Sequence, residues 1–235
     1  MSDELGGNTL LARLPATELE VLRPRLEVVD VRVRDVVHRP RRPIEHVYFP
    51  FSAVFSMVAS TPEDQVGVEV GTIGHEGLVG LPLFLGSPVS PHAAFCQIAG
   101  RAARLPAADL HDFLRQDGRL HRLLHRFTQT TMVQLAQSVA CNRAHTTEQR
   151  ASRWLLTTGD RVRSDRFVLT QDFLGQMLGV RRSTVSEVAG RLAADGLIEY
   201  SRGNVHLRDR PRLAEIACPC YGIVKAEFDA LATEI

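Results

Sequence analysis

The sequence has no marked excess of either charge and almost no lysine. Its 28 basic and 27 acidic side chains leave a formal net charge of +1, so any nucleic-acid-binding surface must be a local one. Lys225 is the only lysine, and every other basic residue is arginine. Because arginine is so frequent, a single arginine is weak evidence for a site, although its guanidinium reads phosphates and base edges well.

Long apolar runs are also absent. No segment has the length and composition of a transmembrane helix, and the polar start MSDELGGN is unlike a signal peptide. We therefore expect no membrane partner and a cytoplasmic location. The four cysteines are too few for a disulfide framework in a chain of this length, so we expect free thiols. With 44% hydrophobic residues, the chain can bury the core of one large domain or two small ones.

Alternating apolar and polar residues predict many short strands between Glu27 and about Leu105. Residues 28–33 and 47–49 alternate in this way, and glycine and proline interrupt the pattern at short intervals. Such punctuation is typical of an antiparallel sandwich or barrel. Short helices are expected before it, where Thr17 and Glu20 have the spacing of a capping box.

From Asp109 to Ala140 the hydrophobic period becomes helical, with no proline and with Gly118 as the only glycine. One apolar stripe along this helix consists of Leu120, Leu124, Phe127, Thr131 and Leu135. A second stripe begins with Met132 and Val139. A helix with apolar residues on two sides must be covered on two sides. We predict that the first stripe is the interface of a homodimer; the alternative is a helix that packs only within its own chain.

The last third of the sequence predicts the order helix, strand, helix, turn, helix, hairpin. Thr146 and Gln149 have capping-box spacing at the start of the first helix. Gly179 separates the next two helices, and a hairpin turns through Arg202–Asn204. Two short helices around a glycine turn, followed by a two-stranded wing, form a winged helix-turn-helix.

In such a module the second helix lies in the major groove of DNA, and only its outward side chains reach base edges. Val185, Val188 and Leu192 form its inward face. The expected base contacts are Arg181, Arg182, Ser183, Ser186 and Glu187. The expected contacts to the DNA backbone are Thr170, Gln171, Thr184, Arg202 and Asn204. The alternatives are a structural corner with solvated arginines and a winged helix that binds protein.

The segment TQDFLGQMLGVRRSTVSEVAGRLAADGLIEYSRGNVHL, together with the order of β-rich region, long helix and winged helix, resembles the CRP/FNR family of bacterial transcription regulators. The stretches IEHVYFPFSAVFSMV and GTIGHEGLVGLPLFLG are similar to the β-roll sensor of that family. The resemblance implies an α+β fold with an antiparallel β-roll, like a cyclic-nucleotide-binding jelly roll. The implied domains are a sensor at 1–108, a dimerisation helix at 109–143, a winged helix-turn-helix at 144–210 and a helical tail at 211–235.

The resemblance also implies a homodimer that binds a near-palindromic operator on double-stranded DNA and has RNA polymerase as a further partner. The family's recognition helix often reads Arg-Glu-x-x-Gly/Ser-Arg. Arg182 fits the first position, but Ser183 and Glu187 stand where the family has glutamate and the second arginine. We therefore expect an operator that differs from the usual family consensus.

The resemblance leaves the signal and the cofactor unknown. The cyclic-nucleotide branch binds its ligand with Gly-Glu-Leu and Arg-Ser, whereas the corresponding stretches here are Gly80-Leu81-Pro82 and Ser90–Phe95. The iron–sulfur branch carries several N-terminal cysteines, and the first cysteine here is Cys96. We expect neither a cyclic nucleotide nor an iron–sulfur cluster.

Cys218-Pro-Cys220 is a candidate redox or metal site and an alternative source of the signal. Two thiolates at this spacing could share a metal or respond to an oxidant, with His206 nearby. A lone C-x-C supplies only two of four zinc ligands, and buried cysteines are common, so we predict no metal site. No catalytic residue and no enzyme are expected, because P-loop, nucleophile-elbow and paired-carboxylate motifs are absent.

Overall fold

The computed structural model describes residues 4–60, 67–115 and 117–233. The chain forms two compact units. The N-terminal unit comprises Met1–Met57, Thr72–Met132 and Phe228–Ile235, and the C-terminal unit comprises Val58–Gly71 and Val133–Glu227. No helix in the described ranges combines the length and the apolar character needed to cross a membrane.

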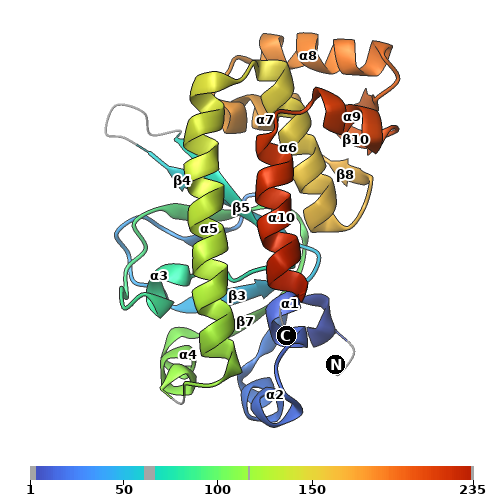
Figure 1. Cartoon of the computed structure of the whole chain (residues 1–235). Helices are drawn as coiled ribbons and strands as arrows, with labels where there is room; N and C mark the ends of the chain where they lie inside the picture. The colour runs from blue at the N-terminus through green and yellow to red at the C-terminus, as the bar shows by residue number, and fades with distance from the viewer. Residues whose placement is uncertain (1–3, 61–66, 116, 234–235) are drawn as a thin grey trace. The chain divides into compact units, whose positions relative to one another are not determined.

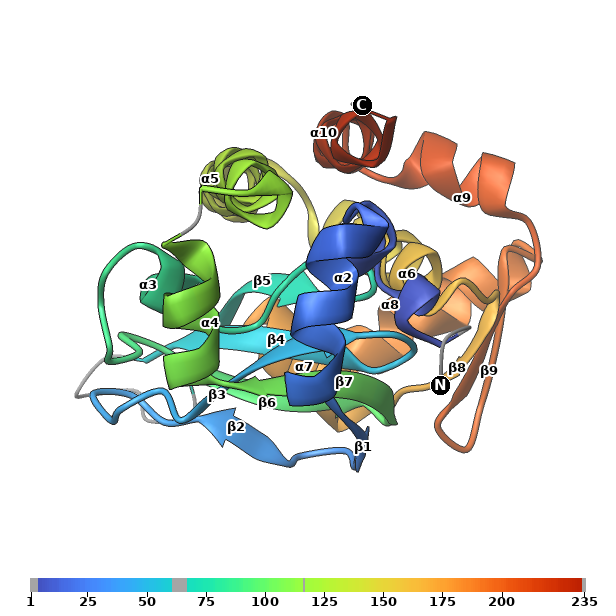
Figure 2. The ribbon, with the colours of Figure 1, turned by 90° about the horizontal axis from the view of Figure 1, so that it is seen from below.

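Two sheets with antiparallel pairing form the N-terminal unit (Figure 2). One sheet has the order β1 (Glu27–Val31), β7 (Gly100–Pro106) and β3 (His46–Pro50). The other has the order β2 (Val36–His38), β6 (Ala93–Ile98), β4 (Val54–Ala59) and β5 (Val68–Ile73). The last residues of β4 and the first residues of β5, which fall within Val58–Gly71, belong to the C-terminal unit. The expected α+β fold with an N-terminal β-roll is confirmed.

The core of the N-terminal unit comes from the alternation of the strands, which sends every second side chain inward. Val47 and Phe49 of β3 and Phe55 of β4 are fully buried in one cluster. Short helices surround this cluster: η1 (Leu5–Gly7), α1 (Thr9–Ala12), α2 (Ala16–Leu22), η2 (Arg23–Arg25), α3 (Leu81–Phe84) and α4 (Ala107–Leu114). Helices α3 and α4 lie side by side (Figure 2). The capping box expected at Thr17 is wrong, because α2 begins before it, with Pro15 as N-cap.

The single helix expected over 109–143 is two helices in the structure, α4 and α5 (Arg119–Ala144). Asp117 has a φ of 46°, which a continuous helix does not tolerate. The carboxylate of Glu18 then accepts hydrogen bonds from the backbone N–H groups of Arg119, at 2.7 Å, and Leu120, at 3.2 Å. A side chain distant in sequence therefore caps the start of α5, and Gly118 leaves the room for it.

The stripe predicted to meet a partner lies inside its own chain, and this corrects the predicted dimer interface. Leu120, Leu124 and Phe127 are fully buried in the core cluster of the N-terminal unit. A Cβ atom on Gly77 would come within 2.4 Å of the Phe127 ring, so the ring lies directly on that glycine. Core side chains packed this closely cannot also contact a second copy.

The remaining residues of this stripe, Thr131 and Leu135, are also largely shielded from solvent. Thr131 is buried and donates a hydrogen bond to the Phe127 carbonyl at 2.8 Å, and Leu135 is half-buried. Instead the second stripe is open to solvent, with Met132 61% and Val139 73% exposed. The sequence periodicity identified both apolar faces of α5, but the prediction placed the buried face at the surface.

The C-terminal unit contains the predicted winged helix (Figure 1). Its elements after α5 are α6 (Thr147–Val162), β8 (Arg166–Val168), α7 (Gln171–Leu178), α8 (Arg182–Ala194), β9 (Ile198–Ser201), β10 (Asn204–Leu207), α9 (Arg210–Ile216) and α10 (Cys220–Thr233). The capping box at the start of α6 is confirmed, because Thr146 and Gln149 each bond the other's backbone. The three strands form one sheet in the order β8–β10–β9.

Candidate nucleic-acid interface

The first helix of the motif, α7, is bounded by local signals at both ends. The Thr170 hydroxyl caps its start by accepting from the Phe173 N–H at 3.2 Å. Gly179 ends it with a φ of 65°, and the Val180 N–H bonds back to the Gly175 carbonyl at 2.9 Å. This is the Schellman arrangement, which favours glycine at the left-handed position. Both ends of α7 agree with the sequence prediction.

The second helix, α8, packs on α7 through the face that its apolar residues predict. Val185, Val188 and Leu192 are each no more than 3% exposed, and α7 and α8 are in contact. A Cβ atom on Gly175 would stand 3.0 Å from the Val180 carbonyl, so the small residue permits the close approach of the two helices. The predicted inward face of α8 is confirmed.

The opposite face of α8 is polar and open to solvent. The five side chains expected to contact bases are all exposed: Arg181, Arg182, Ser183, Ser186 and Glu187. Thr184, expected at the DNA backbone, is partly exposed. Arg181 is the N-cap residue, and among the described residues no side chain caps the first turn of α8. The start of this helix therefore combines a positive dipole end with guanidinium groups, which suits an anionic partner.

The wing is a tight hairpin formed by β9 and β10. Ser201 and Asn204 are paired across it, and the two residues between them, Arg202 and Gly203, have φ values of 50° and 80°. Two positive φ values define the twisted two-residue turn that hairpins prefer. Asn204 was expected in the turn but is the first residue of β10. Arg202 is therefore held at the exposed tip of the wing.

Four of the predicted DNA contacts line a single hollow in the C-terminal unit. Thr170 and Gln171 reach it from the start of α7, Arg182 from the start of α8, and Arg202 from the wing tip. The hollow is completed by Asp172, Tyr200 and Gly203. The Tyr200 hydroxyl donates to the Leu169 carbonyl at 2.8 Å and so ties the wing to the segment before α7. The remaining predicted contacts lie outside this hollow: Arg181, Ser183, Thr184, Ser186, Glu187 and Asn204.

The charges on this surface partly compensate one another. The Arg182 Nε atom lies 3.6 Å from a carboxylate oxygen of Asp172, and Arg191 pairs with Glu148 at 2.9 Å. Sequence reasoning missed Asp172, because its role depends on the packing of α8 across α7. A carboxylate beside Arg182 competes with a nucleic acid for the same guanidinium.

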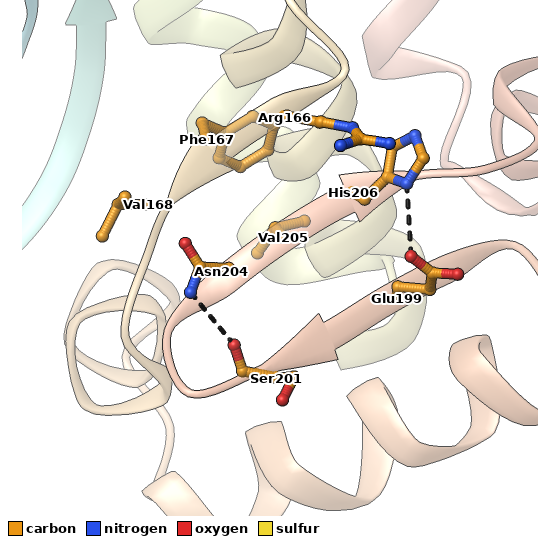
Figure 3. A pocket seen from close by; sticks show the side chains of 8 residues that line it. All are labelled: Arg166, Phe167, Val168, Glu199, Ser201, Asn204, Val205 and His206. Atoms are coloured by element: carbon orange, nitrogen blue, oxygen red, sulfur yellow. Dashed lines mark hydrogen bonds and ion pairs between the residues drawn. The ribbon is translucent and has the colours of Figure 1, made fainter.

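A second hollow lies over the sheet of the wing (Figure 3). Its lining comes from β8, β10 and β9: Arg166, Phe167, Val168, Glu199, Ser201, Asn204, Val205 and His206. The His206 Nδ1 atom lies 3.3 Å from a carboxylate oxygen of Glu199, and the Asn204 amide donates to the Ser201 carbonyl at 3.4 Å (Figure 3). His206 is thus engaged on the wing and is not the histidine beside the cysteine pair.

The Cys218-Pro-Cys220 segment lies against the end of α5. The Sγ atoms of Cys218 and Cys141 are 3.4 Å apart, and the Sγ atom of Cys220 is 3.5 Å from Nδ1 of His145. The four ligand atoms of this Cys₃His cluster, Cys141, His145, Cys218 and Cys220, all lie within 4.8 Å of one another. The prediction of no metal site considered Cys218 and Cys220 alone. The structure places Cys141 and His145 beside them, so that four possible metal ligands lie together.

The Cys141 thiol differs chemically from Cys96, although both are buried. Hydrogen bonding with Cys218 lowers the pKa of the Cys141 thiol, and the positive charge of Arg153 acts in the same direction, while burial opposes both. The same hydrogen bond and burial raise the pKa of the Cys218 thiol. Burial raises the pKa of Cys96, in β6, to about 12. Cys96 is therefore a core thiol.

Cys141 and His145, the other half of this cluster, leave only a weak signal in the sequence. Cys141 and His145 are spaced i, i+4 at the end of a helical pattern, which places them on one helix face. The His145 N–H bonds to the Cys141 carbonyl at 3.1 Å, so the helical turn extends to the histidine. Only the fold brings this pair to a segment 77 residues later.

The comparisons with known proteins agree with this architecture. Residues 149–216 match the Crp-like helix-turn-helix domain. FixK2 from Bradyrhizobium japonicum has a similar structure, with a TM-score of 0.70 and 18% identity over 82% of this chain and 98% of that one. The c-di-GMP-responsive global regulator CLP from Xanthomonas campestris has a TM-score of 0.66 and 17% identity, over 83% of this chain and 100% of that one. A CRP/FNR-family regulator from Eubacterium rectale has a TM-score of 0.66 and 13% identity, over 88% of this chain and 96% of that one. No curated protein sequence matches the chain.

A β-roll, a long helix and a Crp-like helix-turn-helix define a class of DNA-binding regulators. Residues 149–216 form a Crp-like helix-turn-helix domain, and the fold of the chain is similar to that of CRP/FNR-family transcription regulators.

Proposed function

We propose that the protein regulates transcription as a homodimer that inserts the helix around Arg181–Leu192 into the major groove of a near-palindromic operator. The observation that carries this proposal is the hollow shared by the start of α7, the start of α8 and the wing tip. It gathers polar side chains from three segments on the side of α8 that the apolar core leaves open. A structural corner has no need of such an open polar face.

The chemistry of these side chains suggests their roles on DNA. Arg182 offers two parallel N–H donors to guanine O6 and N7, and Glu187 can accept from cytosine N4. Ser183 and Ser186 are short donors and acceptors, and Arg181 stands at the N-cap of the same helix. These five side chains would read bases.

A second set would hold the DNA backbone. Thr170 and Gln171 stand at the helix start of α7, where backbone N–H groups favour phosphates. Thr184 lies in the first turn of α8, while Arg202 and Asn204 would extend the contact from the wing. Because acidic neighbours offset several arginines, affinity would depend on two modules placed together on one operator.

The outward stripe of α5 supports the homodimer. Met132 and Val139 are exposed and apolar, and Ala136 and Ala140 lie exposed at helical spacing between and beside them. Small and flexible apolar side chains at this spacing let two helices approach closely. Two recognition helices related by a two-fold axis would then lie about 34 Å apart on one face of the DNA.

The β-roll is proposed as the sensor of a signal other than a cyclic nucleotide or an N-terminal iron–sulfur cluster. Gly80, Leu81 and Pro82 form the start of α3 and supply no carboxylate for a ribose. Residues 90–95 supply no guanidinium for a phosphate, so a bound cyclic nucleotide would keep an uncompensated charge. A regulator of this kind would work in the cytoplasm with RNA polymerase as a further partner.

The test is selection of bound DNA from a pool of random duplexes by mobility shift of the full-length protein at low salt. We expect enrichment of a near-palindromic sequence with half-sites about one helical turn apart. Arg202→Ala should weaken binding to all sequences alike and reduce the salt slope by about 1. Arg39→Ala, which removes the same charge from the N-terminal unit, should leave binding unchanged. A protein that shifts no duplex, with or without cell extract, would refute the proposal.

A further inference from the structure

We propose that Cys141, His145, Cys218 and Cys220 form a binding site for one zinc ion. The site goes beyond the DNA-binding function, because none of its ligands belongs to the surface of α8 or to the wing. All four residues belong to the C-terminal unit, so their mutual geometry is set within one compact body.

The donor set selects the class of metal. Three thiols and one imidazole are soft or borderline ligands, and hard cations such as Mg²⁺ and Ca²⁺ require oxygen ligands instead. Cys₃His is one of the ligand sets found in closed, structural zinc sites. On binding, the thiols release their protons to solvent, and the metal is held by thiolates and a neutral imidazole.

The distances between the donors favour a single ion over an iron–sulfur cluster. A tetrahedral zinc with bonds of about 2.3 Å to sulfur requires ligand sulfurs about 3.8 Å apart. The Cys141 and Cys218 sulfurs are 3.4 Å apart, and no two donors of the set are farther apart than 4.8 Å. Ligands of a cluster bind different irons and must stand farther apart to enclose it.

The surroundings of the donors are those of a closed site. The three cysteines are each no more than 1% exposed and form a buried cluster of their own, separate from the apolar core. The Gln137 side-chain amide donates to the Cys220 sulfur at 3.2 Å. Such hydrogen bonds from the second layer orient metal ligands and adjust their basicity.

The charge around the donors also suits thiolates. Three thiolates around Zn²⁺ leave a net charge of −1, which needs a nearby cation if it is to remain buried. Arg153 of α6 supplies that positive charge beside Cys141. Its Nε atom is buried and has no hydrogen-bond partner among the described residues, so an anionic metal centre would also compensate this guanidinium.

The position of the site indicates what the metal would do. Cys141 lies in the last turn of α5 and His145 directly follows that helix, whereas Cys218 and Cys220 come from the segment that begins α10. The matched helix-turn-helix domain, residues 149–216, lies between these two pairs in sequence. The Cys218 N–H bonds to the Gln149 carbonyl of α6 at 3.4 Å. A metal at this point closes the chain around the DNA-binding domain, so we expect metal binding to stabilise its fold.

The first experiment measures metal binding by the full-length protein. The protein is purified under reducing conditions, stripped with a chelator and titrated with Co²⁺, whose tetrahedral thiolate complexes absorb strongly in the visible range. We expect one equivalent of Co²⁺ per chain, a sulfur-to-cobalt charge-transfer band and complete displacement by one equivalent of Zn²⁺. Zinc should also raise the unfolding temperature of the stripped protein. No DNA is needed, so failure here and failure of operator binding are distinguishable.

The second experiment assigns the ligands. Cys218→Ser and Cys141→Ser should each weaken zinc binding by roughly 100-fold or more, because second-layer changes alone cost 10–100-fold. Gln137→Ala keeps all four ligands and should weaken zinc binding by about 10-fold with the fold intact. Cys96→Ser, which removes a buried thiol of the N-terminal unit, is the matched control and should bind zinc as the unchanged protein does.

Several results would overturn the zinc site. One is a reduced wild-type protein that binds neither Co²⁺ nor Zn²⁺. Another is a Cys218→Ser variant that binds zinc with unchanged affinity. A third is the absorption of an iron–sulfur cluster in the purified protein. A Cys141–Cys218 disulfide that forms in air, combined with no metal binding after reduction, would assign the pair to redox chemistry instead.

Discussion

Helices α5 and α8 each bury one face, but their outward faces carry opposite chemistry. Outside α5 are Met132 and Val139, which are apolar and mostly exposed. Outside α8 are exposed arginine, serine and glutamate side chains, with Arg182 at the first helical position. An apolar helix face gains free energy when a second protein surface covers it, whereas a polar face with a positive dipole end gains it beside phosphates and base edges. A helix with one buried face therefore presents an apolar surface at α5 and a polar, cationic surface at α8.

The inner faces of the two helices are alike in containing buried aliphatic or aromatic side chains, although α5 also buries polar residues such as Thr131 and Gln134. Phe127 of α5 lies on Gly77, and Val185 of α8 lies near Gly175. Changes on the inner faces should therefore affect folding, whereas changes on the outer faces should affect partners. Substitutions that separate these two effects test the comparison.

The largest effect is expected on the inner face of α5. Phe127→Ala leaves a cavity beside Gly77, and it should lower the free energy of unfolding by about 3–5 kcal/mol. Chemical denaturation followed by circular dichroism measures this change. Met132→Ala, on the outer face of the same helix, is the control and should change the monomer's stability by less than about 1 kcal/mol. Equal losses for the two variants would show that the helix has no single inward face.

The next effect is expected on the outer face of α5. Val139→Glu would place two carboxylates in an apolar dimer interface, and it should weaken dimerisation by roughly 2–4 kcal/mol. Sedimentation velocity over a range of protein concentrations should show more monomer and, with it, weaker operator binding. Val21→Glu introduces the same charge at a half-exposed position of α2 and should leave the dimer intact. A wild-type protein that stays monomeric at high concentration would contradict the homodimer.

A smaller effect is expected on the outer face of α8. Arg182→Ala should cost about 1–3 kcal/mol of operator binding and relax the preference at one base position. Mobility shifts against operators substituted one position at a time measure both quantities. A uniform loss across all operators would make Arg182 a phosphate contact and leave the choice of sequence to its neighbours.

The smallest effect concerns the carboxylate beside that arginine. Asp172→Asn removes the charge 3.6 Å from the Arg182 Nε atom and frees the guanidinium for DNA. Affinity should rise by less than about 1 kcal/mol, because an exposed ion pair contributes little. Asp195→Asn removes an equal charge at the far end of α8 and should give a smaller gain. A loss of affinity in Asp172→Asn would show that the pair positions Arg182 for DNA.

The parts of the fold that were predicted correctly depend on neighbours in sequence. Thr170 caps α7 through an N–H three residues away, and Gly179 ends it because few residues adopt a positive φ. The capping box at Thr146 is equally local. Thr17 shows the limit of such signals, since Pro15 starts the same helix two residues earlier.

The parts that were predicted wrongly depend on contacts between distant segments. Both stripes of α5 contain apolar residues, so periodicity could not tell which one the β-roll would cover. The inward face is set by contacts from distant segments, with Gly77 against Phe127 and Glu18 at the start of the helix. On α8 one face is polar, and the assignment was unambiguous. We expected His206 near the cysteines, yet it contacts Glu199 of the neighbouring strand.

The sequence by itself determined the order of elements in the winged helix, the helix boundaries at Thr146, Thr170 and Gly179, and the polar face of α8. Each of these follows from backbone preferences and side-chain periodicity within a few residues. Tertiary structure alone decided the outward face of α5, the pairing of Arg182 with Asp172, and the meeting of Cys141 and His145 with Cys218 and Cys220. Those outcomes depend on long-range packing, which joins groups up to 77 residues apart and which no local pattern encodes.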